Sequence, residues 1–135
     1  MYVKRTSVFI LRDEQGKVLL QHRDENAPTS PNHWGLFGGT IEDNETPDQT
    51  LKREAMEELG IELKDIKFFK RYEYLKKGKG RQEKFVYVGP IKHKLEQLRK
   101  QQKEGDDIGL FSYEEIKKLK ITEHNKIVFK ELFDK

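Results

Sequence analysis

Residues 46–60, TPDQTLKREAMEELG, constrain the fold more than any other stretch, because they carry start and stop signals for one α-helix. Thr46 can cap the helix N-terminus, and Gln49 stands where it completes a capping box. Pro47 suits the first helical position, and Gly60 supplies the stop. The sequence therefore predicts a helix between the cap at Thr46 and Gly60.

Three glutamates crowd this helix, Glu54, Glu57 and Glu58, directly after Arg53. At about 100° per residue the acids fall on one arc beside the apolar stripe, and Arg53 can pair with Glu57 four residues on. The stripe consists of Leu51, Ala55 and Leu59. Like charges at this spacing weaken a helix, and an unpartnered carboxylate beside a buried face is costly. The acids indicate either an ordinary charged surface helix or a site for a hard divalent cation, Mg²⁺ or Mn²⁺.

Composition narrows the class of protein. A chain of 135 residues, 34% hydrophobic and 38% charged, predicts a single domain over residues 1–135. The net charge of +3 is small beside 27 basic and 24 acidic residues, so a dedicated nucleic-acid binder is not expected. Without cysteine, disulfides and thiol catalysis are excluded. The N-terminal apolar stretch is too short for a signal peptide or membrane span, which favours a cytoplasmic protein without membrane contact.

The remaining pattern alternates strands with helices. Strand-like runs cover residues 3–11, 17–23, 62–75, 82–89 and 108–111, and residues 24–33 form a long loop. Residues 91–107 are ambiguous between a helix and a mobile loop. Ser112 can cap a short helix and Thr122 a final one, whose inward side chains are expected to be Ile127, Val128, Leu132 and Phe133. This order predicts a mixed α/β or α+β sandwich.

Residues 39–61, GTIEDNETPDQTLKREAMEELGI, resemble the Nudix box, and HWGLFGG just before it is similar to the family's tryptophan-containing segment that ends in Gly-Gly. The box positions are matched without a gap by Gly39, Glu45, Arg53, Glu54, Ala55, Glu57, Glu58, Gly60 and Ile61. One departure is Phe37, which stands where the family commonly has proline. The resemblance implies an α/β Nudix fold, a mixed β-sheet in an α/β/α sandwich with a catalytic loop–helix–loop, over nearly the whole chain.

The resemblance also implies a catalytic site that holds a divalent metal, Mg²⁺ with Mn²⁺ as an option, against a diphosphate. The implied metal ligands are the carboxylates of Glu54, Glu57 and Glu58 and the carbonyl of Gly38. Arg53 is expected to orient a neighbouring glutamate, and Glu45 to be structural.

An acid outside the box commonly completes such sites. In KEGDDIGLF the resemblance favours Glu104 over Asp106 and Asp107, and the alternative is that this acidic cluster is only a solvated loop. Either Glu54 or Glu104 is expected to take the proton from the attacking water.

Substrate contacts are expected from Arg23, Trp34, Phe37, Gly38 and Gly39. Trp34 and Phe37, with Phe9, could stack on a base, but each could equally be a core aromatic, and Arg23 could be a solvated charge. A basic hairpin tip carries Lys76, Lys77, Lys79, Arg81 and Lys84. It could attract polyphosphate or RNA, or it could only discourage edge-strand pairing.

The expected function is metal-dependent cleavage of a nucleoside diphosphate linked to another group, with a nucleoside triphosphate or a modified one such as 8-oxo-dGTP as the default substrate. One alternative is a Nudix-fold nucleotide-binding or regulatory module without turnover. Another is RNA decapping or RNA pyrophosphohydrolysis, although a nucleic-acid partner is not expected from the charge balance. Many Nudix proteins are dimers, so the resemblance also allows a homodimer.

Overall fold

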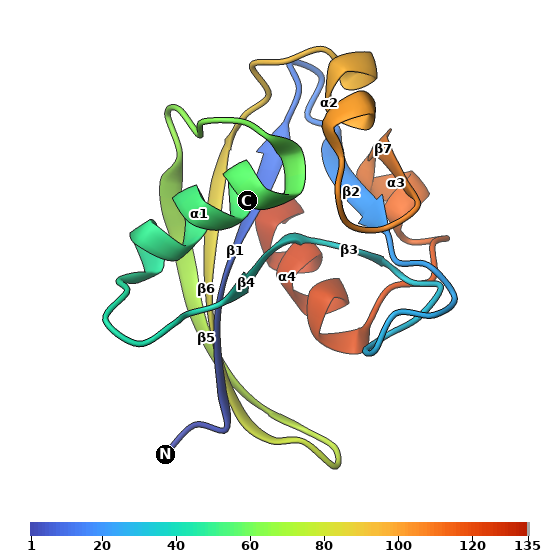
Figure 1. Ribbon diagram of the computed structural model, residues 1–135. Helices are drawn as coiled ribbons and strands as arrows, with labels where there is room; N and C mark the ends of the chain where they lie inside the picture. Colours follow the sequence, from blue (N-terminus) through green and yellow to red (C-terminus); the bar gives the residue numbers. More distant parts are fainter. Residues whose placement is uncertain (135) are drawn as a thin grey trace.

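The computed structural model describes residues 1–134, and a mixed β-sheet lies at its centre (Figure 1). Its strands are β1 (Lys4–Arg12), β2 (Val18–His22), β3 (Trp34–Gly35), β4 (Phe37–Thr40), β5 (Lys67–Lys76), β6 (Gly80–Pro90) and β7 (Asp107–Phe111). The strand order is β3-β2-β1-β6-β5, with β4 beside β1 and β7 beside β2. Only β1 and β6 run parallel; the other pairs are antiparallel.

Strand β1 is the centre of the sheet, and its two edges differ. One edge pairs with β6 from Lys4 to Arg12. The other edge is shared, because β4 occupies residues 6–9 and β2 joins only at Arg12. The sheet therefore divides between β2 and β4, and the segment from β2 to β4 crosses this division.

Helices cover both faces of the sheet. In Figure 1, α1 (Pro47–Leu59) and α4 (Glu123–Phe133) lie on opposite sides of β1 and β6. The alternation along β1 explains this, because Phe9 and Leu11 belong to the core under α1 while Val8 and Ile10 belong to the core under α4. Two shorter helices are α2 (Leu95–Gln101), on the α1 side, and α3 (Tyr113–Ile116), on the α4 side. The predicted α/β/α sandwich is confirmed.

Helix α1 forms as its sequence predicts. The Thr46 hydroxyl accepts a hydrogen bond from the Gln49 N–H at 3.2 Å, and the Gln49 side chain accepts from the Thr46 N–H at 2.9 Å. Gly60 ends the helix with φ of 66°, a left-handed conformation that favours glycine. The stripe of Leu51, Ala55 and Leu59 is at most 1% exposed, so burial of this face fixes how α1 sits on the sheet.

Two expectations are changed by the structure. The ambiguous stretch 91–107 contains α2, whose Leu98 is buried. The prediction that Ile127 points inward is wrong, since Ile127 is 52% exposed and Phe129 is fully buried instead. Helical geometry explains the shift: Phe129 lies one turn from Asn125 and Leu132 on the buried face, and Ile127 falls outside that arc. Among the described residues, no helix is long and apolar enough to cross a membrane.

Candidate active site

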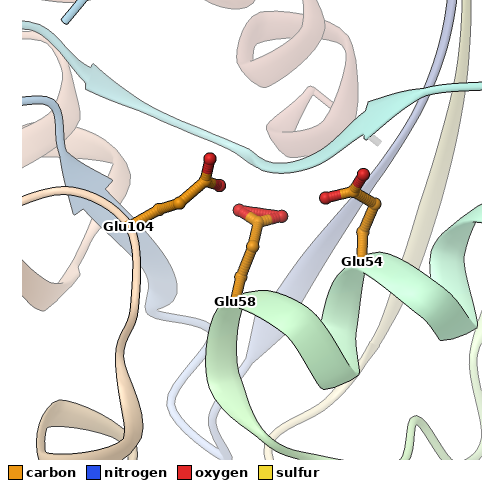
Figure 2. Close-up of side chains that lie close together, drawn as sticks. All are labelled: Glu54, Glu58 and Glu104. Carbon is orange, nitrogen blue, oxygen red and sulfur yellow. The ribbon is translucent and has the colours of Figure 1, made fainter.

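Three carboxylates from two separate segments meet at the C-terminal half of α1. Glu54 and Glu58, one turn apart, project from the helix, and Glu104 comes from the loop between α2 and β7 (Figure 2). One oxygen of each carboxylate lies within 4.8 Å of the others. Figure 2 shows the three groups pointing toward one another, which for three like charges is unfavourable unless a proton or a cation lies between them.

Glu58 is the most constrained of the three. It is 2% exposed, and its Oε1 accepts a hydrogen bond from the Gly38 N–H at 2.9 Å. Its Oε2 is buried and has no hydrogen-bond partner within residues 1–134. Burial, and then the neighbouring Glu104, raise the pKa of Glu58 to about 10. A buried carboxylate with one orphaned oxygen, facing two more carboxylates, is the donor set that a hard divalent cation prefers.

Arg53 fixes the position of Glu54. Its Nη1 donates to Glu54 Oε1 at 2.8 Å, while Nε and Nη2 hold both oxygens of Glu45 at 2.7 and 2.9 Å. Nη2 also donates to the Thr40 carbonyl at 3.1 Å. The hydrogen bonds from Arg53 lower the pKa of Glu45 to about 2, so this pair stays charged and rigid at neutral pH. Burial raises the pKa of Glu54, and the contact with Arg53 opposes that effect.

Two adjacent glycines in β4 let the backbone approach these groups. Gly38 has φ of 141°, and a Cβ there would overlap the Ser7 carbonyl and the Val8 backbone. A Cβ at Gly39 would overlap the carboxylate of Glu54. Gly38 thus allows β4 to lie close to β1, and Gly39 makes room for the Glu54 carboxylate. Their assignment as substrate contacts stays a prediction.

The loop that carries Glu104 separates the three candidate acids of the segment KEGDD. Asp106 lies 2.7 Å from His22 Nδ1 and Asp107 lies 3.3 Å from Arg99 Nε, so both have partners elsewhere. The loop is tied to α1, because the Lys103 N–H donates to the Glu58 carbonyl at 2.8 Å. Glu104 alone of these acids joins the cluster with Glu54 and Glu58.

Glu57 lies outside the three-carboxylate cluster. Its side chain is 57% exposed, and its Oε2 is 3.3 Å from Arg53 Nη1, the pairing predicted from the helix. Its assignment as a metal ligand stays a prediction.

A pocket of about 360 Å³ opens beside Glu104. The loop after β2 lines one side with Arg23 and Asp24, and the loop before β7 lines the other with Lys103 and Glu104, so each wall carries one basic and one acidic side chain. Its volume falls within the range of roughly 300–1,000 Å³ typical of small-molecule sites. The pocket therefore gives a ligand access to the acid contributed by the outer loop.

The aromatic candidates take different places. The Phe9 and Phe37 rings stack at 5.7 Å, and these residues are 0% and 1% exposed inside the core. The core alternative thus holds for both, and their rings offer no face to a base. Trp34 is only partly buried and lines a second pocket together with Arg23.

Comparison with known proteins agrees with this geometry. A family model described as "NUDIX domain" matches residues 1–132. The chain belongs to the NUDIX family. Solved Nudix structures share its fold: the MutT NUDIX hydrolase of Burkholderia pseudomallei superposes with a TM-score of 0.76 at 20% identity, covering 94% of this chain and 95% of that one. The MutT protein of Methanosarcina mazei gives a TM-score of 0.73 at 23% identity, covering 95% and 91%.

Curated Nudix relatives match more locally. The 8-oxo-dGTP diphosphatase of Escherichia coli is 35% identical over 68 residues, 50% of this chain and 52% of the relative. The nucleoside triphosphatase NudI of Salmonella agona is 38% identical over 60 residues, 44% and 43% of the two chains. The chain therefore spans about half the length of these relatives or less.

The sequence-based prediction for one polar residue, Lys84, was wrong. Lys84 was grouped with the basic hairpin tip, but it lies within β6, its residue is 8% exposed, and it lines the same pocket as Trp34. The alternation of β6 carried a signal for this, since Lys84 shares strand parity with Val86, which is buried in the core under α4. The tip itself is the turn between Lys76 and Gly80.

Proposed function

We propose that this protein is a divalent-metal-dependent pyrophosphohydrolase of nucleoside triphosphates, ordinary or modified as in 8-oxo-dGTP, that forms a nucleoside monophosphate and a phosphate product. The observation that carries the proposal is the cluster of Glu54, Glu58 and Glu104, with a buried oxygen that has no partner among the described residues. Family membership and the names of the relatives, 8-oxo-dGTP diphosphatase and nucleoside triphosphatase, support the reaction class.

The donor set fits Mg²⁺ or Mn²⁺. Glu54, Glu58 and Glu104 would hold the ion, with the Gly38 carbonyl and Glu57 as the further predicted ligands. When bound, such an ion supplies charge neutralisation at phosphate oxygens and lowers the pKa of a coordinated water. All of these proposed ligands are oxygen atoms, which matches the preference of these hard ions.

The chain's own residues have separable roles. Arg53, through its hydrogen bonds to Glu45 and Glu54, positions the Glu54 carboxylate and lets it move little. Either Glu54 or the exposed Glu104 takes the proton from the attacking water, since both can reach the space between the carboxylates. Phosphoryl transfer asks the protein mainly for such positioning and for charge stabilisation.

Positive groups beside the cluster suit the phosphate chain of a nucleotide. Arg23 and Lys103 line the pocket that opens at Glu104. Arg23 is held in place, because its Nε donates to the Thr29 carbonyl at 2.7 Å. A guanidinium fixed in this way can bind a phosphate with little loss of side-chain freedom.

The direct test is a hydrolysis screen of nucleoside triphosphates, including 8-oxo-dGTP, with Mg²⁺ or Mn²⁺ and with EDTA, products being identified by mass. We expect a nucleoside monophosphate and loss of turnover in EDTA. Glu58→Gln should lower kcat by about a hundredfold or more, since it removes a charge that the ion requires. Glu62→Gln is the matched control, because Glu62 is an exposed acid just beyond α1.

The screen also separates the two alternatives. A binding module without turnover would bind nucleotide but release no product under any metal condition, and that result would refute the proposal. An RNA pyrophosphohydrolase would prefer 5′-triphosphorylated RNA, with affinity that falls steeply with salt. A flat salt dependence would exclude the basic hairpin tip as an RNA site.

A further inference from the structure

A second, smaller pocket gathers three cationic side chains that no acidic group of the described residues neutralises. Arg23 follows β2, Lys76 ends β5 and Lys84 lies within β6, and all three line a pocket of about 150 Å³ at the N-terminal end of α4. Among residues 1–134, none of these three side chains forms an ion pair. The cavity that these three side chains line, Arg23, Lys76 and Lys84, is called the cationic pocket below.

Lys84 is the unusual member, because a buried ammonium normally has a carboxylate partner. Its residue is 8% exposed, and its Nζ donates to Asn125 Oδ1 at 2.9 Å and lies 3.1 Å from His124 Nδ1. Burial, and then Lys84 itself, lower the pKa of His124 to about 4, so this ring is neutral at neutral pH. Both hydrogen-bonding partners of the Lys84 amine are therefore uncharged, and the Tyr74 ring, whose centroid is 5.5 Å from Nζ, is a neutral neighbour as well. These contacts offset part of the cost of burying the amine, but none of them supplies a counter-charge.

The charged side chains of the cationic pocket can only donate hydrogen bonds, while the hydroxyl groups that also line it can donate or accept. Lysine and arginine side chains carry no acceptor, and Asn125 uses its carbonyl oxygen for Lys84, so its NH₂ is the group that remains for a ligand. The Arg23 guanidinium is fixed by hydrogen bonds to the Thr29 carbonyl and hydroxyl at 2.7 and 3.1 Å. A phosphate monoester, whose second pKa is about 6, is mainly a dianion at neutral pH and presents mainly acceptors, whereas a nucleobase edge mixes donors and acceptors. The chemistry of the walls thus favours an anion.

Size and position say more about the ligand. The volume of about 150 Å³ is below the range of roughly 300–1,000 Å³ for whole small molecules, so the pocket takes one small group. Arg23 lines this pocket and also the larger one that contains Glu104. The two pockets therefore share Arg23 as a wall residue, and the larger of them reaches Glu104 of the three-carboxylate cluster.

We propose that the cationic pocket is a second anion site, which binds a phosphate group separate from the diphosphate at the acidic cluster. The substrate is then a nucleotide with an additional phosphate remote from the bond that is cleaved; this last step rests on the proposed hydrolase function, but the anion site does not. Binding an anion gives the buried Lys84 amine the counter-charge that no described side chain supplies.

The single tryptophan of the chain makes this testable, because Trp34 lines the cationic pocket. Inorganic phosphate, titrated in EDTA at constant ionic strength, should change Trp34 fluorescence in a saturable way. Lys84→Met should weaken the affinity by about tenfold or more, since it removes a charge-assisted hydrogen bond. Lys76→Met, at an exposed position, should weaken it roughly two- to fivefold. Lys77→Met is the matched control, an exposed lysine of the same hairpin outside the pocket, and should leave the affinity unchanged.

Three results would overturn the anion site. They are no saturable change in the wild-type protein, an unchanged affinity in both Lys84→Met and Lys76→Met, or a Lys84-dependent response to uncharged guanosine in place of phosphate. Should Lys84→Met fail to fold, Lys76→Met still decides the matter, since its side chain is exposed. The titration involves no metal and no turnover, so its failure leaves the hydrolase proposal standing, and a negative hydrolysis screen leaves the anion site standing.

Discussion

Replacing Lys84 with methionine should change the way in which the stability of the protein depends on pH. Burial lowers the pKa of Lys84 to about 7, from an ordinary value of 10.5, and the charges of Lys76 and Lys4 add to the effect. Between these two values the unfolded chain holds a proton on this amine that the folded protein has released. Stability therefore rises with pH across this window, because the unfolded state binds more protons.

The magnitude follows from the width of the window. One proton of difference is worth at most about 1.4 kcal/mol of unfolding free energy per pH unit. From pH 7 to pH 9 the wild-type protein should gain up to about 3 kcal/mol from Lys84 alone, or roughly 10 °C in Tm for a chain of this size. A methionine side chain has no charge to desolvate, so Lys84→Met should be more stable than wild type near pH 7 and should lose that advantage as pH rises.

The assay is thermal or urea unfolding of wild type and Lys84→Met from pH 6 to 10, in EDTA and in buffers free of phosphate. The quantity to follow is the difference between the two proteins, since other titrating groups contribute to both. His124, the neighbour whose pKa is also lowered, titrates near pH 4 and does not enter this range. Adding inorganic phosphate should flatten the difference, because a bound anion keeps the Lys84 amine protonated.

A constant difference from pH 7 to 10 would refute the reasoning. It would mean that the Lys84 amine stays protonated in the folded protein throughout this range, because water reaches it. Lys77→Met again serves as the control, since Lys77 is an exposed lysine of the same hairpin that does not line the pocket.

Three further changes probe the acidic cluster. Arg53→Lys should lower the free energy of unfolding by about 1–3 kcal/mol and should also lower activity, because one ammonium cannot hold Glu45 bidentately and Glu54 as well. Unfolding curves and kcat measure the two effects, and an unchanged kcat would show that Arg53 has no positioning role. Gly39→Ala should reduce metal affinity and kcat roughly 10–100-fold by displacing Glu54, with a small change in Tm; near wild-type metal binding by calorimetry would contradict the close approach. Glu57→Gln should reduce kcat about tenfold, well short of the effect of the buried acids, because Glu57 is exposed and outside the cluster; an undiminished kcat would remove it from the predicted ligands.

Helix α1 was predictable in detail because its signals are local. The capping box, the proline after it and the glycine stop act within one or two turns, and the helix begins and ends where they place it. The convergence of Glu54 and Glu58 followed from the helical period alone. Glu57, on the outer side of the same arc, shows the limit of that argument. A helical wheel gives the direction of a side chain, but it does not show which segment of the protein faces that side chain.

Long-range placement was harder to predict. Glu104 was expected from the resemblance to the Nudix family, and its sequence neighbours Asp106 and Asp107 are equally acidic. What distinguishes them is their contact with His22 and Arg99, residues distant in the chain. Similarly, Phe37 was open to two interpretations because its neighbour in space, Phe9, belongs to β1, and only the pairing of β1 with β4 brings the two rings together.

The fixed spacing of the box has a physical reason that only the three-dimensional contacts reveal. Arg53 donates to Glu45, to Glu54 and to the Thr40 carbonyl, so one guanidinium links the loop before α1, the end of β4 and the site itself. Gly39 must be small because Glu54 lies against its backbone. An insertion between Gly39 and Arg53 would break these contacts even if every acid were kept, and the Glu54 carboxylate would then lose its fixed position. The spacing of the motif therefore matters as much as its residue types, because the contacts of Arg53 and Gly39 hold the loop, the strand end and the helix together. A variant that alters only the length of residues 40–46 should lose activity while α1 still forms.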